Sequence, residues 1–156
     1  MTVINLSPQL DAIRLKYPEW WRSEEAQHEL QALWGNPACN EHGVLPAQER
    51  IDIDLPAQSQ WKAAVEITRT PNGWYAFATS YSYALGGASS PISVWNKTAC
   101  TTRDEAIEAG IDELRRSFEA LRNAKGSSPE SHIANATRMI ALLDQYRDQS
   151  RQMILF

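Results

Sequence analysis

The sequence has little cysteine, no long hydrophobic run and no excess of basic side chains, and each shortage excludes a class of protein. Only two of the 156 residues are cysteines, Cys39 and Cys100, which is too few for a disulfide scaffold and is typical of a reducing compartment. No stretch approaches the roughly 20 apolar residues that cross a bilayer, and the N-terminal residues lack the features of a signal peptide. We therefore expect a cytoplasmic protein with no membrane partner.

Charge is small in total and unevenly distributed. The formal net charge is −4 and the isoelectric point is about 5.4, which argues against a protein that coats nucleic acid through bulk positive charge. Residues 1–60 hold 4 basic and 9 acidic side chains, so the acidity belongs to the N-terminal third. Apolar residues make up 43% of the chain, a fraction typical of globular proteins, and the length predicts one domain.

No catalytic signature is present, and we expect a protein that is not an enzyme and needs no cofactor. Gly86-Gly87 lacks the lysine and the spacing of a phosphate-binding loop. Ser89 and Ser90 have no histidine nearby in the sequence, so nothing indicates a nucleophilic triad. Asp52 and Asp54 lie on one side of a predicted strand, and turn or cap residues are favoured over a catalytic carboxylate pair.

Metal binding has only a weak basis in the sequence. Cys39 and His42 are separated by two residues, and His28 lies upstream. A structural zinc ion needs four ligands, and the fourth would have to be Glu41 or Cys100. A lone pair of this kind is common by chance, so we predict no metal site.

Two helices are expected in the first 35 residues. Ser7-Pro8 places a capping residue before a proline at the first helical position, and Pro18 ends this helix. A second helix begins near Ser23 and ends at Gly35, a residue suited to a C-cap. Between the two helices lies Trp20-Trp21; one ring is expected to hold the helices together, and the other is a candidate for a partner surface.

The middle of the chain predicts strands. Residues 36–60 show little periodicity and read as a long loop with one short strand at 50–55. Alternation from residue 61 to 68 predicts a half-buried strand, and Pro71-Asn72-Gly73 predicts a tight turn into a second strand over 74–85. Residues 86–90 are expected to form a flexible connection, and residues 91–98 a third strand at the sheet edge.

Two further helices complete the predicted fold. Thr102 and Glu105 form a capping box ahead of a long amphipathic helix, in which Gly110 is the one weak point. Ser128-Pro129 opens the last helix, expected to fray around 148–151. The predicted class is α+β: a three-stranded antiparallel sheet packed on a long helix, with N-terminal helices and a C-terminal helix. We predict one domain at 1–151, followed by a linear-motif tail at 152–156. The domain consists of a helical arm (1–35), a loop (36–60), a β-β-β-α core (61–125) and a final helix (128–150).

Aromatic side chains are concentrated in the predicted strands. Such a surface, with basic residues interleaved, can stack on the bases of single-stranded nucleic acid. The alternative, that most rings form core and cross-strand pairs, is favoured because basic residues are sparse here. The candidates for nucleic-acid contact are Lys62, Arg69, Tyr75, Phe77, Tyr81 and Lys97.

The order of elements in residues 61–121 also resembles two families of small domains. Three strands and a helix entered by Thr-Thr-Arg-Asp-Glu-Ala resemble the partial RNase-H-like fold of HicB-type antitoxins. With a preceding helix, the order resembles a double-stranded-RNA-binding domain, although Asp104 and Glu105 stand where such domains carry basic residues. These resemblances concern topology and imply, as the alternative function, a nucleic-acid-binding or antitoxin-like regulatory module.

The last five residues, Gln152-Met153-Ile154-Leu155-Phe156, form an apolar run after a polar helix. They resemble the short linear motif with which bacterial proteins bind the DNA polymerase sliding clamp: glutamine, then leucine or methionine, a variable residue, leucine and phenylalanine. The resemblance implies that Gln152 hydrogen-bonds the rim of the clamp groove, that Met153 packs at its entrance, and that Leu155 and Phe156 fill its apolar pocket. The alternative is that these residues fold back onto the chain or close a dimer.

The sequence therefore predicts a non-enzymatic accessory protein of DNA metabolism, bound to the sliding clamp through residues 152–156. Small proteins of this style are typical of plasmids, phages and integrated elements, which makes a mobile element the expected origin. The sequence leaves the oligomeric state open.

Overall fold

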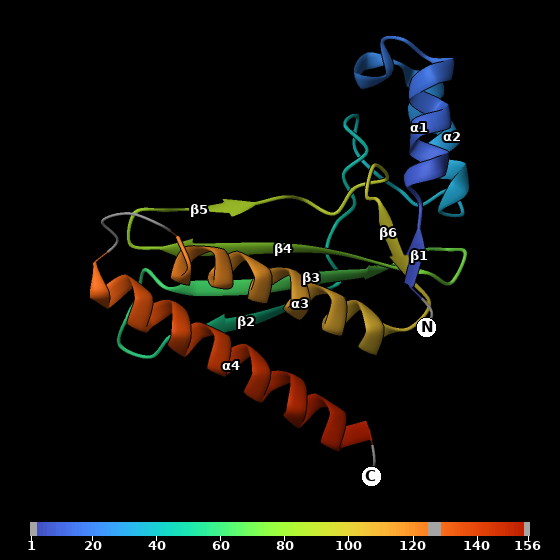
Figure 1. Ribbon diagram of the computed structural model, residues 1–156. Helices are drawn as coiled ribbons and strands as arrows, with labels where there is room; N and C mark the ends of the chain where they lie inside the picture. Colours follow the sequence, from blue (N-terminus) through green and yellow to red (C-terminus); the bar gives the residue numbers. More distant parts are fainter. Residues whose placement is uncertain (1–2, 125–128, 155–156) are drawn as a thin grey trace. The chain divides into compact units, whose positions relative to one another are not determined.

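The computed structural model describes residues 3–124 and 129–154, with side chains up to Gln152. Within these residues it confirms the α+β class, with four α-helices and a six-stranded antiparallel sheet (Figure 1). The helices are α1 (Ser7–Lys16), α2 (Glu24–Leu33), α3 (Arg103–Arg122) and α4 (Glu130–Ile154), with a short 3₁₀ helix at Trp20–Arg22. The strands are β1 (Val3–Asn5), β2 (Glu49–Asp54), β3 (Lys62–Arg69), β4 (Tyr75–Tyr83), β5 (Gly86–Ser89) and β6 (Thr98–Cys100).

The chain divides into two compact units, which are described separately. Unit 1 comprises Met1–Glu49, Glu66–Ala78 and Pro91–Ala106, and unit 2 comprises Arg50–Val65, Thr79–Ser90 and Ile107–Phe156. Strands are paired in the order β1-β6-β4-β3-β2, and β5 pairs with β4. None of the helices in the described part of the chain has the length and hydropathy that a membrane span requires.

The sheet is larger than the three strands predicted. Strand β2, which matches the short strand expected at 50–55, is part of it, and β1 and β5 join it by backbone pairing. In unit 1, β1 pairs with β6, with Val3 opposite Cys100. In unit 2, β5 occupies the stretch expected to be a flexible connection and pairs with β4, with Ser80 opposite Ser89. A Cβ atom on Gly87 would collide with the backbone of β4 at Tyr81, so the missing side chain permits this close approach.

The predicted strand at 91–98 is wrong. Ile92 and Val94 are buried, but the segment makes only an isolated bridge between Ser93 and Val44, and strand β6 begins at Thr98. Here the burial occurs without a ladder of backbone hydrogen bonds.

Unit 1 has a core of small and aliphatic side chains around one tryptophan. Trp34 is fully buried, and its Nε1 donates a hydrogen bond to the carbonyl oxygen of Val94 at 3.1 Å. The ring of Trp74 meets that of Trp34 edge-on, with centroids 5.7 Å apart. The buried cluster consists of Leu6, Leu10, Leu30, Trp34, Leu45, Ala76, Ala78, Ile92, Val94 and Ala99.

Helix α2 begins and ends where its caps predict. The backbone N–H of Ala26 donates to Oγ of Ser23 at 3.2 Å, which satisfies one donor of the first turn. Gly35 has φ +83°, the left-handed conformation common after a helix. At the start of α1 the predicted capping residue was Ser7, but Ser7 is already helical. Its backbone N–H donates to the side-chain oxygen of Asn5 at 3.0 Å, so Asn5 supplies the capping oxygen.

In unit 2, α3 packs closely on β3. The buried residues Ile107, Ile111, Leu114 and Phe118 confirm the predicted apolar period of this helix. A Cβ atom on Gly110 would lie 2.7 Å from Cγ1 of Val65, so glycine here allows the helix to approach the strand. The inner face of α4 buries Ala136, Met139, Ile140 and Leu143.

Candidate functional site

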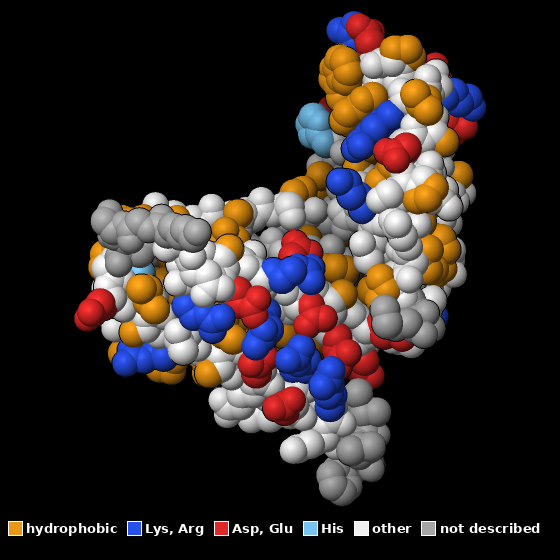
Figure 2. All heavy atoms as spheres, viewed as in Figure 1, with side chains coloured by type: hydrophobic (Ala, Val, Ile, Leu, Met, Phe, Trp, Pro, Cys, Tyr) orange, Lys and Arg blue, Asp and Glu red, His pale blue; other side chains and the backbone are white. Residues whose placement is uncertain are grey.

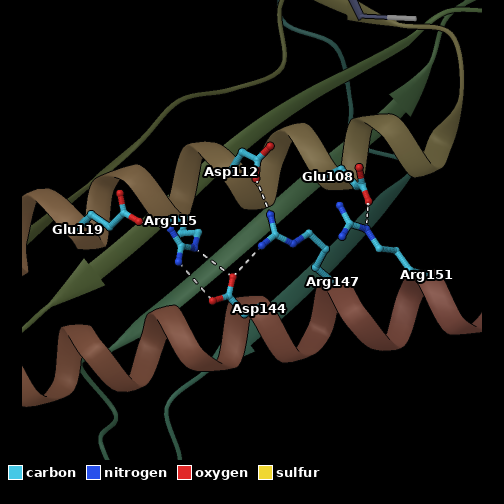
Figure 3. A network of polar contacts seen from close by, with 7 residues as sticks. All are labelled: Glu108, Asp112, Arg115, Glu119, Asp144, Arg147 and Arg151. Atoms are coloured by element: carbon cyan, nitrogen blue, oxygen red, sulfur yellow. Dashed lines mark hydrogen bonds and ion pairs between the residues drawn. The ribbon is translucent and has the colours of Figure 1, made fainter. Parts of the chain in front are cut away.

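Helices α3 and α4 lie side by side in unit 2 and are joined by a network of ion pairs (Figure 3). Oδ1 of Asp144 accepts hydrogen bonds from Nε of Arg115 at 3.0 Å and from Nη2 of Arg147 at 2.9 Å. Nη1 of Arg147 also donates to Oδ1 of Asp112 on α3, at 2.8 Å. The hydrogen bond and the charge of Asp144 hold the pKa of Arg115 above its ordinary value. Figure 2 shows the result at the surface, with acidic and basic side chains interleaved over α3 and α4.

The last turns of α4 are attached to α3 by charges. Leu143 is the last residue of α4 that is buried, among the side chains whose burial is described. Beyond it, the final link to α3 is the ion pair of Arg151 with Glu108, whose Nε and Oε1 atoms are 2.5 Å apart. The side chains of this pair keep relative exposures of 55% and 41%, and such exposed pairs stabilise a fold by at most about 1 kcal/mol.

The candidate clamp-binding residues follow directly after this ion pair. Gln152 is exposed and still helical. The backbone of Met153 continues the helix, while its side chain, Leu155 and Phe156 lie outside the described residues. The expected fraying at 148–151 is wrong, because α4 extends to Ile154. Arg147 and Arg151, one helical turn apart, both reach acidic partners on α3, and this explains the longer helix.

The candidate nucleic-acid residues are divided between the two units. Lys62 is exposed on β3 and Tyr81 is half-buried on β4, both in unit 2. The Tyr81 ring lies edge-on to the buried ring of Phe118, with centroids 5.5 Å apart, so it contributes to the packing of α3 on the sheet. The other four, all in unit 1, are Arg69, Tyr75, Phe77 and Lys97.

Within unit 1, two of the four form a local pair. The guanidinium carbon of Arg69 lies 6.0 Å from the ring centroid of Tyr75, at the outer limit of a cation–π contact. Phe77 is half-buried and Lys97 is exposed. One basic side chain beside one ring is less than the series of rings and charges on which single strands stack.

Asp52 and Asp54 lie in unit 2, whereas Cys39, Glu41 and His42 lie in unit 1. Nε of Arg50 donates to Oδ1 of Asp52 at 2.9 Å, and both line a cavity of about 380 Å³ in unit 2. Nε2 of His42 lies 3.4 Å from Oε1 of Glu41, and Cys39 accepts a hydrogen bond from Gln27. In the described part of the chain, no three His, Cys, Asp or Glu side chains come together as a metal site would require.

Cys100 gives a direct test of the packing of β6. Burial raises the pKa of its thiol to about 11, with a smaller contribution from the charge of Glu105. Since the thiolate is the reactive form, we expect iodoacetamide at pH 8 to modify Cys100 roughly two orders of magnitude more slowly in the folded chain than in urea. Mass spectrometry of digested samples measures both rates, and equal rates would contradict the buried position of this thiol.

The sequence did not reveal the partners in the α3–α4 network. Arg115 and Glu119 are spaced for a pair within one helix, and they do contact each other. The contacts of Asp144 and Arg147 with α3 are between residues 29 and 35 positions apart, and no local spacing indicates them.

Compared with known proteins, the chain matches no family model, no curated protein and no solved structure. Its function is therefore argued from its own residues.

Proposed function

We propose that this chain is a non-enzymatic accessory protein of DNA metabolism that binds the bacterial DNA polymerase sliding clamp through Gln152, Met153, Leu155 and Phe156. One observation carries the proposal: the motif residues begin with an exposed glutamine, immediately after the last ion pair that attaches α4 to α3. Gln152 is thus accessible, and the ion pair of Arg151 with Glu108 that precedes it is weak.

The contacts that hold the end of α4 would cost little to release. A clamp groove would receive the motif as an extended peptide, so the final turn of α4 would have to unwind. Helix ends fray at small cost, and the ion pair of Arg151 with Glu108 is exposed and contributes at most about 1 kcal/mol. Burying a leucine or a phenylalanine side chain contributes about 1.5–3 kcal/mol each. Two anchors therefore outweigh the loss of one exposed ion pair.

Binding to a purified sliding clamp tests the proposal. In a surface-binding assay with the full chain, we expect Gln152→Ala to weaken binding by about tenfold and the double variant Leu155→Ala/Phe156→Ala to abolish detectable binding. Leu85→Ala is the matched control, because Leu85 is 77% exposed in unit 2 and lies outside the motif; its affinity should equal that of the parent chain.

Two outcomes would contradict the proposal. The first is a parent chain that shows no clamp binding, and the second is binding that the motif variants leave unchanged. If a single-stranded oligonucleotide binds instead, with an affinity that falls steeply as salt rises, the alternative of a nucleic-acid-binding module would be favoured.

A further inference from the structure

Unit 1 contains a groove that combines tryptophan rings with carboxylates. Its volume is about 480 Å³, and it lies between the 3₁₀ helix at Trp20–Arg22, the start of α2 and the loop around residue 42. Its walls include Trp20, Trp21, Trp95, Glu24, Glu41 and His42.

The aromatic wall leaves one ring largely uncovered. The centroids of Trp20 and Trp95 are 5.1 Å apart, and Trp21 stands nearly perpendicular to Trp20, with centroids 5.7 Å apart. Trp21 remains 64% exposed. An exposed apolar side chain alone is common, but apolar rings that gather beside a groove with a polar rim mark an interaction site. A tryptophan in that position is a typical anchor point for a bound peptide.

The loop around residue 42, which also lines the groove, is held in place by hydrogen bonds. Oδ1 of Asn40 accepts from the backbone N–H of His42 at 2.8 Å and of Val44 at 3.0 Å. The side chain of Gln27 on α2 donates to the carbonyl oxygen of Asn40 at 3.2 Å. The N–H of Val94 donates to the carbonyl oxygen of Gly43 at 3.0 Å, which ties this turn to the segment that carries Trp95. The groove is thus preformed, and little ordering is needed when a ligand binds.

The charges at the groove favour a cation. Glu24 and Glu41 line it, and among the residues that the structure describes Glu24 has no ion pair and Glu41 has only the histidine contact. Arg22, the basic residue of the wall, is bound to Glu19 at 2.6 Å. An adjoining hollow is lined by Glu19, Glu24 and Glu25. The residues that line the two depressions therefore include four carboxylates and one guanidinium, and that guanidinium is paired with Glu19.

Trp20 already holds one guanidinium. The central carbon of the Arg14 guanidinium lies 4.6 Å from the ring centroid of Trp20, well within the range of a cation–π contact. Trp21 offers a second, exposed ring beside the unpaired carboxylate of Glu24. An arginine or lysine side chain brought by another molecule would find both a ring face and a charge partner.

We propose that this groove binds a basic segment of a partner protein, with an arginine or lysine side chain against Trp21 and paired with Glu24 or Glu41. The proposal concerns a different surface from the clamp motif and does not depend on it. Nucleic acids and acidic membrane surfaces would be repelled by Glu24, Glu25 and Glu41, which have no lysine or arginine partner among the described residues. A basic peptide gains from the rings and from these charges.

A labelled decapeptide of alternating glycine and arginine is the probe, measured with the full chain by fluorescence anisotropy at low salt. We expect Trp21→Ala to weaken binding by about tenfold, and Glu24→Gln and Glu41→Gln by about threefold each. The affinity of the parent chain should fall as salt rises. These variants alter exposed side chains, and their melting temperatures should match that of the parent chain.

Two control variants separate the groove from general effects. Leu15→Ala removes an 85% exposed apolar side chain from α1, and Glu130→Gln removes one exposed charge from α4; both should bind within about twofold of the parent chain. The proposal is overturned if Trp21→Ala binds normally or if Glu130→Gln weakens binding as much as Glu24→Gln. Tighter binding of an uncharged proline-rich decapeptide, or of a single-stranded oligonucleotide, would also overturn it.

Discussion

Replacing Trp34 with alanine should lower the free energy of unfolding by about 3–5 kcal/mol. The side chain is completely buried in the core of unit 1, and its removal leaves a large cavity that the neighbouring aliphatic residues cannot fill. The variant also loses the hydrogen bond from Nε1 to the carbonyl oxygen of Val94, which leaves a buried acceptor unpaired. Urea unfolding followed by circular dichroism measures the change.

The matched control is the same substitution at Trp21, which is 64% exposed. Trp21→Ala should change the free energy of unfolding by less than about 0.5 kcal/mol. Similar losses at the two positions would mean that Trp34 does not occupy the core of unit 1 as described.

Replacing Gly110 with valine should lower the free energy of unfolding by about 3 kcal/mol, although valine is the better helix former of the two. The first added carbon would lie 2.7 Å from Cγ1 and 3.0 Å from Cγ2 of Val65, and a β-branched side chain on a strand has few rotamers with which to move away. The cost of overpacking should therefore exceed the gain in helix propensity.

Two further variants identify the contact that causes this loss. Ala120→Val places the same side chain on an exposed position of α3 and should cost about 0.5 kcal/mol. Adding Val65→Ala to Gly110→Val should restore at least about 1 kcal/mol, since the two residues share one space. Strict additivity of the two substitutions would contradict direct packing of α3 on β3 at this point.

The helices of the fold could be predicted from the sequence because their signals are local. The cap at Ser23, the stop at Gly35 and the apolar period of α3 are all encoded within a few residues of one another, and the structure confirms each of them. Local residues also predicted the turn at Pro71-Asn72-Gly73 and strand β4, and both are present in the structure.

The additional strands could not be predicted because their partners are distant in sequence. Strand β1 pairs with residues 98–100, and β5 uses glycine, which carries no side-chain pattern, to pair with β4. At 91–98 a strand was predicted where the structure has none: Ile92 and Val94 are buried, but their segment forms no strand. Backbone pairing across the sheet is set by tertiary contacts more than by local propensity.

The same distinction applies to the two candidate binding sites. The proposed clamp motif is five consecutive residues, so the sequence alone indicates it. The groove of unit 1 depends on Trp95 lying against Trp20 and on the turn at Asn40, contacts between segments far apart in the chain. Of this groove, the sequence indicated only that one of the paired tryptophans was a candidate for a partner surface.

The central claim is that residues 152–156 serve a partner and not the core of their own chain. The most direct measurement compares the full chain with a chain that ends at Arg151, for binding to the purified sliding clamp and for urea unfolding. We predict that the shortened chain loses clamp binding, while its free energy of unfolding stays within about 1 kcal/mol of the full chain, because α4 has no described buried side chain beyond Leu143. Retained clamp binding, or a loss of several kcal/mol in stability, would contradict the claim.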